Sequence, residues 1–236
     1  MGGVPPPQRV LVQLITLPPT RASEGSLYRS IEWGAERSAH VLLRRSYRDR
    51  VLLRGGDARP GALVDALDQA TADPAVLAVD LAIHPHGTSR RLLLEDGPVS
   101  MEALVTRVRD RLDAARRRRL RAVFSTACFG MAHADGWLRA GFATAVGARG
   151  IYADGLTSVP SMFRGWARGR TVEQCVESAN AGRLCRRQDA AAARYYDRSG
   201  RHGDAMAVDS MRIVDGARAM RIDTDPAQWR PARLPA

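Results

Sequence analysis

The amino-acid sequence predicts an α/β protein with a mostly parallel central sheet flanked by helices. Short apolar segments rich in Val, Leu, Ile and Ala recur along the chain, and segments with apolar residues at helical spacing separate them. One of these apolar segments, residues 75–84, is almost unbroken, which is typical of a strand covered on both faces. Regular alternation of strand and helix then favours parallel pairing.

The first part of the chain supplies three strands and two helices. The strands are expected at 9–17, 50–56 and 75–84, and the helices at 25–39 and 60–72. Leu63, Val64 and Leu67 give the second helix its apolar face. After the third strand, the dipeptide Asp96-Gly97 predicts a tight, hairpin-like turn.

The second part continues the same pattern. Ser100 is expected to cap a helix that runs to about residue 115. Strands are expected at 120–127 and 143–153, helices at 159–168 and 172–180, and a final hairpin at 210–223. Thr171 and Gln174 have the spacing of a capping box. We expect one domain over 1–236, with 183–236 as a C-terminal extension in which the periodicity weakens.

Composition narrows the function classes. The 236 residues carry a net charge of +11, and all 36 basic residues are arginine, spread along the chain rather than gathered in one stripe. Aromatic residues make up only 6% and are not interleaved with the arginines, so we expect no nucleic-acid partner. No apolar run approaches the roughly 20 residues of a membrane span, so no membrane partner is expected. Three cysteines and no signal-peptide pattern favour the cytoplasm.

Two chemically active residues follow neighbouring strands of the predicted sheet. His86 and Gly87 come directly after the strand 75–84, and Cys128 follows the strand 120–127. Parallel strands bring their carboxyl ends to one edge of the sheet, where open α/β proteins build their sites. An imidazole and a thiol at that edge can act as acid/base and nucleophile on one substrate.

Other interpretations of these residues stay open at this stage. Cys128 can be a small buried core residue. His84, His86 and His133, with Cys128, can form a zinc site, although no fourth ligand is placed by spacing and we expect no metal or other cofactor. His84 is followed by Pro rather than Gly, which favours a structural role. Cys175 lies on an apolar helix face, and Cys185 gives no usable pattern.

The segments "IHPHG" and "VFSTACFG" resemble the motifs of the caspase-like cysteine peptidases. This group includes caspases, metacaspases, clostripain, gingipains and the CHAT-domain proteases. Its pattern is an apolar strand ending in His-Gly, followed by an apolar strand ending in a small residue, Cys and a nearby Gly. The resemblance covers residues 75–180, and the segment "LLLEDGPVSMEAL" is closest to the CHAT branch.

The resemblance implies a caspase-like three-layer fold and a role for each matched residue. His86 would be the catalytic histidine and Cys128 the nucleophile. The backbone N–H groups of Gly87 and Cys128 would form the oxyanion hole. The loop "GIYADGLTS" would line the pocket for the substrate residue before the cleaved bond, so that Asp154 would bind a basic side chain there.

The chain also departs from the family pattern. Thr126 and Phe129 stand where caspases have Gln and Arg, and Thr126 also replaces the acidic residue of metacaspases. The sequence therefore predicts a cysteine endopeptidase with a His-Cys dyad that acts on a specific protein or peptide substrate. We expect a neighbouring gene to encode that substrate. The alternative is a catalytically inactive caspase-like binding or scaffold module.

Overall fold

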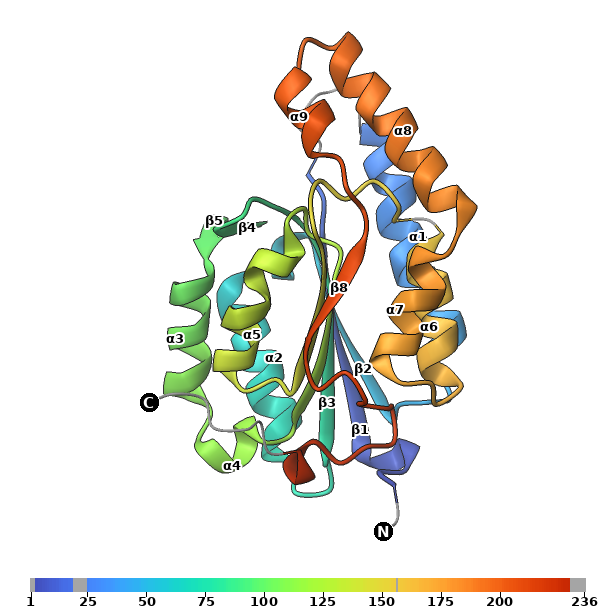
Figure 1. The fold of residues 1–236 in the computed structure, drawn as a ribbon. Helices are drawn as coiled ribbons and strands as arrows, with labels where there is room; N and C mark the ends of the chain where they lie inside the picture. The colour runs from blue at the N-terminus through green and yellow to red at the C-terminus, as the bar shows by residue number, and fades with distance from the viewer. Residues whose placement is uncertain (1–2, 19–24, 156, 230–236) are drawn as a thin grey trace.

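The computed structural model describes residues 3–18, 25–155 and 157–229, and it confirms the predicted fold class (Figure 1). The strands are β1 (Arg9–Thr16), β2 (Asp49–Arg54), β3 (Ala78–Gly87), β4 (Arg91–Leu94), β5 (Gly97–Ser100), β6 (Leu120–Ser125), β7 (Thr144–Ala148) and β8 (Arg212–Gly216). The helices are α1 (Gly25–Leu43), α2 (Pro60–Ala72), α3 (Met101–Arg111), α4 (Ala114–Arg117), α5 (Ala134–Ala140), α6 (Ser158–Ala167), α7 (Val172–Asn180), α8 (Arg183–Arg198) and α9 (His202–Ala207).

The central sheet has the strand order β2-β1-β3-β6-β7-β8. All neighbouring pairs are parallel except β7 and β8, which are antiparallel. Strands β4 and β5 form a hairpin that extends from the end of β3. The hairpin turns at Gly97, whose φ of +107° suits a residue without a Cβ. The turn predicted at Asp96-Gly97 is thus confirmed.

Helices cover both faces of the sheet. Helices α2, α3 and α5 pack on one face, and α1, α6 and α7 pack on the other (Figure 1). Within β1, Val12 and Leu14 join the first core while Leu11 joins the second. Because successive residues of a strand point to opposite faces, a doubly covered strand must be apolar throughout. This is the physical origin of the continuous apolar runs in the sequence.

A buried ion pair links two central strands. Asp80 of β3 and Arg121 of β6 have no exposed side-chain surface, and their atoms Oδ2 and Nη2 lie 2.6 Å apart. Tyr47 donates a hydrogen bond to Asp80 at 2.5 Å, and Trp166 of α6 donates one to Tyr47 at 2.9 Å. Every charged group of this cluster has a partner, which offsets the desolvation cost of burying the two charges between β3 and β6.

Two helix starts follow the predicted chemistry. The Ser100 hydroxyl accepts a hydrogen bond from the Ala103 N–H at 3.1 Å and caps α3. Thr171 and Gln174 form the predicted reciprocal capping box at the start of α7. These local rules were reliable because each depends on residues within one turn.

Three predicted elements need correction. The strand predicted at 75–84 begins at Ala78 and continues to Gly87, since His86 and Gly87 pair with β4. The strand predicted at 143–153 ends at Ala148. The hairpin predicted at 210–223 is wrong: only Arg212–Gly216 forms a strand, and it pairs with β7 instead of with the residues that follow it.

The extension beyond residue 182 is more helical than its sequence suggested. Helices α8 and α9 stand at the same end of the sheet as the β4–β5 hairpin (Figure 1). Backbone hydrogen bonds tie the end of α9 to the loop after β7, as in the pairing of the Ile151 N–H with the Ala207 carbonyl at 2.8 Å. Among the described residues, no helix is both long enough and apolar enough to span a bilayer.

Candidate active site

His86 and Cys128 are brought to the same edge of the sheet. His86 is the penultimate residue of β3, and Cys128 lies three residues beyond the end of β6, which is the parallel neighbour of β3. The backbones approach closely at this point: a Cβ placed on Gly87 would lie 2.8 Å from the Cys128 carbonyl oxygen and 3.0 Å from the Ala127 Cβ. Only glycine therefore fits after His86, which explains the His-Gly pair in the sequence.

Contacts from the N-terminal part of the chain orient the His86 ring. Its Nε2 lies 2.9 Å from the Pro18 carbonyl oxygen. A carbonyl oxygen only accepts, so Nε2 must carry a proton, and in the neutral ring Nδ1 then carries the lone pair. The Tyr28 ring of α1 meets the imidazole edge to face, with ring centroids 4.9 Å apart. Neither contact could be predicted from a local pattern, because both residues lie far from His86 along the chain, Pro18 by 68 residues.

The Cys128 thiol is half-buried at the start of a tight loop. Burial raises its pKa, and the carboxylate of Asp204 on α9 acts in the same direction. The backbone N–H groups of Tyr152 and of Cys128 itself act against this shift. The resting form at neutral pH is the thiol, so a nucleophilic role needs a base that removes its proton.

The loop that carries Cys128 is held in an uncommon backbone conformation. Phe129 has a φ of 55°, in the left-handed region that non-glycine residues seldom occupy. Its N–H donates to the Gly150 carbonyl at 2.8 Å. Behind it, a Cβ on Gly147 of β7 would lie 2.2 Å from the Gly130 carbonyl carbon, so the two backbones touch directly. Strained conformations of this kind persist where surrounding contacts fix them and cluster at functional sites.

The other two candidate histidines have separate partners. His84 is buried, its Nδ1 lies 3.0 Å from the Thr126 hydroxyl, and burial lowers its pKa to about 3, with Arg212 acting in the same direction. The His133 Nε2 donates to the Thr88 carbonyl at 2.6 Å, and burial lowers its pKa. The rings therefore do not converge on one point. Over the described parts of the chain, no three His, Cys, Asp or Glu side chains are grouped as a metal site would need.

Asp154 lies in a buried polar cluster beneath α8. Its Oδ1 accepts from the Thr157 hydroxyl, and the Gln188 amide donates to the same oxygen at 2.9 Å in the orientation that satisfies its neighbours. Its Oδ2 has no hydrogen-bond partner within the described residues. Cys185 belongs to the same cluster, and burial together with Asp154 and Asp189 raises its pKa to about 12. Asp154 is thus enclosed by the extension, which the sequence did not anticipate.

Helix α8 also carries a residue, Tyr196, that interacts electrostatically with Cys128. Burial raises the pKa of Tyr196 to about 12, and Cys128 is the next largest cause. The Arg201 guanidinium lies over the Tyr196 ring, 4.5 Å from its centroid. The candidate dyad is therefore bordered on one side by Pro18 and Tyr28 and on the other by α8 and α9.

Comparisons with known proteins agree with the architecture. No protein-family model matches the chain, and no curated protein matches it in sequence. Among solved structures it is similar to caspase-1 from Spodoptera frugiperda, with 9% identity, 97% of this chain and 94% of that chain covered, and a TM-score of 0.56. It also matches a secreted C11 cysteine protease from Bacteroides thetaiotaomicron, in complex with an irreversible peptide inhibitor, at 8% identity and a TM-score of 0.44. That match covers 66% of this chain and 54% of the protease chain. The chain has the caspase-like fold.

Proposed function

We propose that this protein is a cysteine-type endopeptidase in which His86 and Cys128 form the catalytic dyad. The observation that carries the proposal is their placement on adjacent parallel strands, with the Gly87 and Cys128 backbones in contact and the His86 ring oriented by the Pro18 carbonyl. The caspase-like fold supports this reading, because the two residues occupy the strand ends at which the sequence motifs place them. Unpaired Cys128, Cys175 and Cys185 favour a reducing compartment such as the cytoplasm.

The chemistry follows from the tautomer of His86. Its Nδ1 takes the proton of the Cys128 thiol, and the resulting thiolate attacks the carbonyl carbon of the substrate peptide bond. Backbone N–H groups of Gly87 and Cys128 stabilise the oxyanion. When the C–N bond breaks, the imidazolium gives its proton to the leaving amine, and a thioester to Cys128 remains. A water molecule, deprotonated by His86, then hydrolyses the thioester, and the thiol is restored.

Two finer assignments belong to the same proposal. Asp154 would select a basic substrate side chain; the support is a buried carboxylate oxygen that has no partner among the described residues, and a substrate would reach it only if α8, which covers it, moved. The β4–β5 hairpin and α3 lie between the two motif strands, where the sequence resemblance to the CHAT branch is greatest. That branch would make a specific protein the substrate.

A thiol-directed peptide probe tests the proposal. The wild-type chain should be labelled at Cys128, and the Cys128→Ala variant should lose both labelling and proteolysis while its melting temperature changes by only a few degrees. Cys175→Ala is the matched control, because Cys175 is buried in the core between α6 and α7, away from the strand ends. Proteolysis by the Cys128→Ala variant would overturn the proposal. A folded wild type that resists every probe would favour the inactive scaffold instead.

A further inference from the structure

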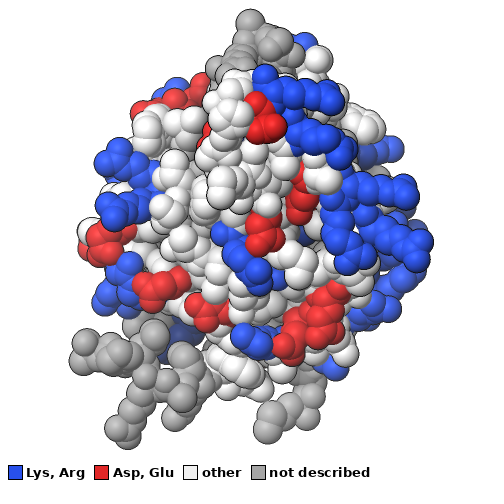
Figure 2. Space-filling model, turned by 45° about the horizontal axis from the view of Figure 1, so that its top comes forward, with Lys and Arg blue, Asp and Glu red and all other residues white. Residues whose placement is uncertain are grey.

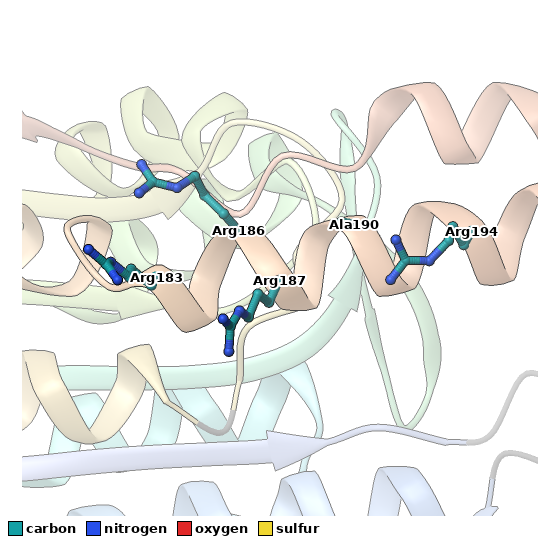
Figure 3. Close-up of a pocket in the computed structure, with 5 residues that line it drawn as sticks. All are labelled: Arg183, Arg186, Arg187, Ala190 and Arg194. Atoms are coloured by element: carbon teal, nitrogen blue, oxygen red, sulfur yellow. The ribbon is translucent and has the colours of Figure 1, made fainter.

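Helix α8 presents four arginines on one face. All four are exposed, and they are Arg183, Arg186, Arg187 and Arg194. The last three follow Arg183 by three, four and eleven residues, which places all of them on one side of the helix. They surround a shallow hollow of about 520 Å³ with Ala190 at its floor (Figure 3). The side chains of Arg186 and Arg187 diverge from one turn of the helix, and Arg194 reaches back along the helix towards Ala190 (Figure 3). Figure 2 shows basic side chains gathered on the side of the molecule where α8 lies.

These four charges are not neutralised within the described part of the chain. No hydrogen bond or ion pair forms at their guanidinium groups, whereas other arginines, such as Arg111 and Arg139, have carboxylate partners. The two acidic residues of α8 point elsewhere: Asp189 accepts from Ser210 at 2.5 Å, and Asp197 lies 2.5 Å from His202. Four guanidinium groups without partners create a positive potential that attracts an anionic ligand.

The opposite face of the same helix borders the candidate active site. Cys185 and Gln188 face Asp154, and Tyr196 is close enough to Cys128 for the two groups to interact electrostatically. A polypeptide that binds the arginine face is therefore attached to the helix that borders the candidate active site. Residues adjacent to the held segment would be at high effective concentration near Cys128.

We propose that the arginine face of α8 binds an acidic segment of the substrate polypeptide, outside the residues that are cleaved. This inference rests on the proposed peptidase function and names the class of its substrate. Arg183 and Arg194 are separated by eleven residues, or roughly 16 Å of helix. An extended segment of about five residues spans that length, and guanidinium groups bind carboxylates through paired N–H donors.

The features of the face favour a peptide over a nucleic acid. Binding of single-stranded nucleic acid uses aromatic side chains on which bases stack. The aromatic residues of α8 are Tyr195 and Tyr196, whose rings meet edge to face with their centroids 5.7 Å apart. The Arg201 guanidinium also covers the Tyr196 ring. Neither lines the hollow, whose floor is the methyl group of Ala190. The small floor allows carboxylates to approach all four guanidinium groups.

A binding experiment separates the possible occupants. The probe is a fluorescent peptide with six consecutive Glu residues, and its anisotropy is measured with the Cys128→Ala full chain at low and physiological salt. Replacing the four arginines by Gln (R183Q/R186Q/R187Q/R194Q) keeps good helix formers and should weaken binding at least tenfold. The control variant R45Q/R107Q/R109Q/R118Q removes the same charge from other exposed positions and should change binding less than threefold.

Three results would overturn the inference. The first is that the wild-type arginine face does not bind the Glu peptide. The second is that the α8 variant and the control variant lose affinity for the Glu peptide equally. The third is that a single-stranded RNA oligonucleotide or anionic lipid vesicles bind more tightly than the Glu peptide, and that this binding disappears in the α8 variant. A matched peptide with six Gln residues should not bind.

A kinetic experiment keeps this inference distinct from the proposed function. Peptide libraries carrying the six-Glu or the six-Gln segment are cleaved by active wild type and by the active α8 variant. The Glu segment should raise kcat/KM at least fivefold, mainly through KM, in the wild type alone, while labelling of Cys128 by a small probe stays equal in both proteins. If neither the wild type nor the α8 variant is labelled, the proposed peptidase function is refuted. The anisotropy result would then still decide whether α8 binds acidic peptides. Normal labelling with no effect of the Glu segment would refute this inference alone.

Discussion

The Nε2 atom of His86 lies 2.9 Å from the carbonyl oxygen of Pro18, and this contact leaves Nδ1 as the ring nitrogen that can act as a base. The donor must be Nε2–H, so the basic nitrogen is Nδ1. A backbone carbonyl cannot be removed by substitution of its side chain. The tautomer therefore depends on the path of the chain after β1.

Replacing His86 by Ala should lower turnover by roughly 10² to 10⁴ because the general base is lost. His84→Ala should have a much smaller effect on turnover, since the ring of His84 is buried against Thr126. Its main effect should be on stability, because a buried side chain is removed and leaves a cavity. Steady-state kinetics and thermal unfolding of both variants check this. A larger loss of turnover for His84→Ala would show that the histidines have been assigned the wrong way round.

Asp154→Asn should remove a preference for Lys or Arg before the cleaved bond. A buried carboxylate pairs with a basic side chain and leaves an unpaired charge beside an apolar one, so the wild type should discriminate between them. The measurement is cleavage of a peptide library by both proteins. A wild-type preference for Leu, Asp or small residues would contradict this role.

Stability should fall as the pH drops from about 6.5 towards 3. The pKa of His84 is lowered to about 3 in the folded protein, while an unfolded chain has the ordinary value near 6.5. In that window the unfolded chain binds a proton that the folded protein does not, so stability present above pH 6.5 is lost on acidification, by about 1.4 kcal/mol per pH unit at most. His133, whose pKa burial also lowers, acts in the same direction.

Urea unfolding at several pH values measures how the free energy of unfolding changes with pH. His84→Gln should flatten the slope of this dependence, because the amide does not titrate and can still bond to Thr126. His40→Gln, at an exposed position of α1, is the matched control and should leave the slope unchanged. Identical slopes for the wild type and His84→Gln would rule out the buried neutral imidazole as the cause.

Asp80→Asn should destabilise the protein by about 3–5 kcal/mol, because the buried Arg121 charge loses its partner. Glu102→Gln breaks an ion pair of similar length, 2.8 Å, to Arg139 on the surface and should cost about 1 kcal/mol or less. Denaturant unfolding of the two variants compares them. Equal losses would mean that the ion pair between β3 and β6 is not a main source of stability.

Activity should not require a cut between Cys128 and β7. The intervening residues form α5, whose Trp137 is only 1% exposed, so they are packed rather than available to a protease. We expect a thiol probe to label the intact chain, with the mass of the labelled species measured by mass spectrometry. Labelling that begins only after cleavage within 130–143 would contradict this.

The sequence predicted the sheet well and its C-terminal extension poorly, for a physical reason. Doubly covered strands such as β3 and β6 are apolar throughout, so their own residues identify them. Helix α8 buries only Cys185 among its sixteen residues, so it lacks the core-facing apolar stripe by which the other helices could be identified. The hairpin predicted at 210–223 failed because β8 finds its partner in β7, far away in the sequence.

The candidate site, too, has residues that could be predicted from local sequence and residues that could not. His86, Gly87 and Cys128 could be found because each ends a strand within a short motif. Pro18 and Tyr196 could not, because they reach the site from distant segments and belong to no local pattern. Asp154 was found in the predicted loop, but its burial under α8 depends on a helix that the sequence did not reveal.

The direct backbone contact between Gly130 and Gly147 limits how this protein can be redesigned. With no side chain between the Cys128 loop and β7, exchanging a larger residue for a smaller one cannot shift the thiol by a fraction of an ångström. A side chain at residue 147 would overlap the Gly130 backbone and force the strand and the loop apart, and one at residue 130 would lie only 3.1 Å from the Gly147 Cα. Changes of substrate preference must therefore be sought on the surrounding walls, and libraries that randomise residues 130 and 147 should yield mostly unfolded chains.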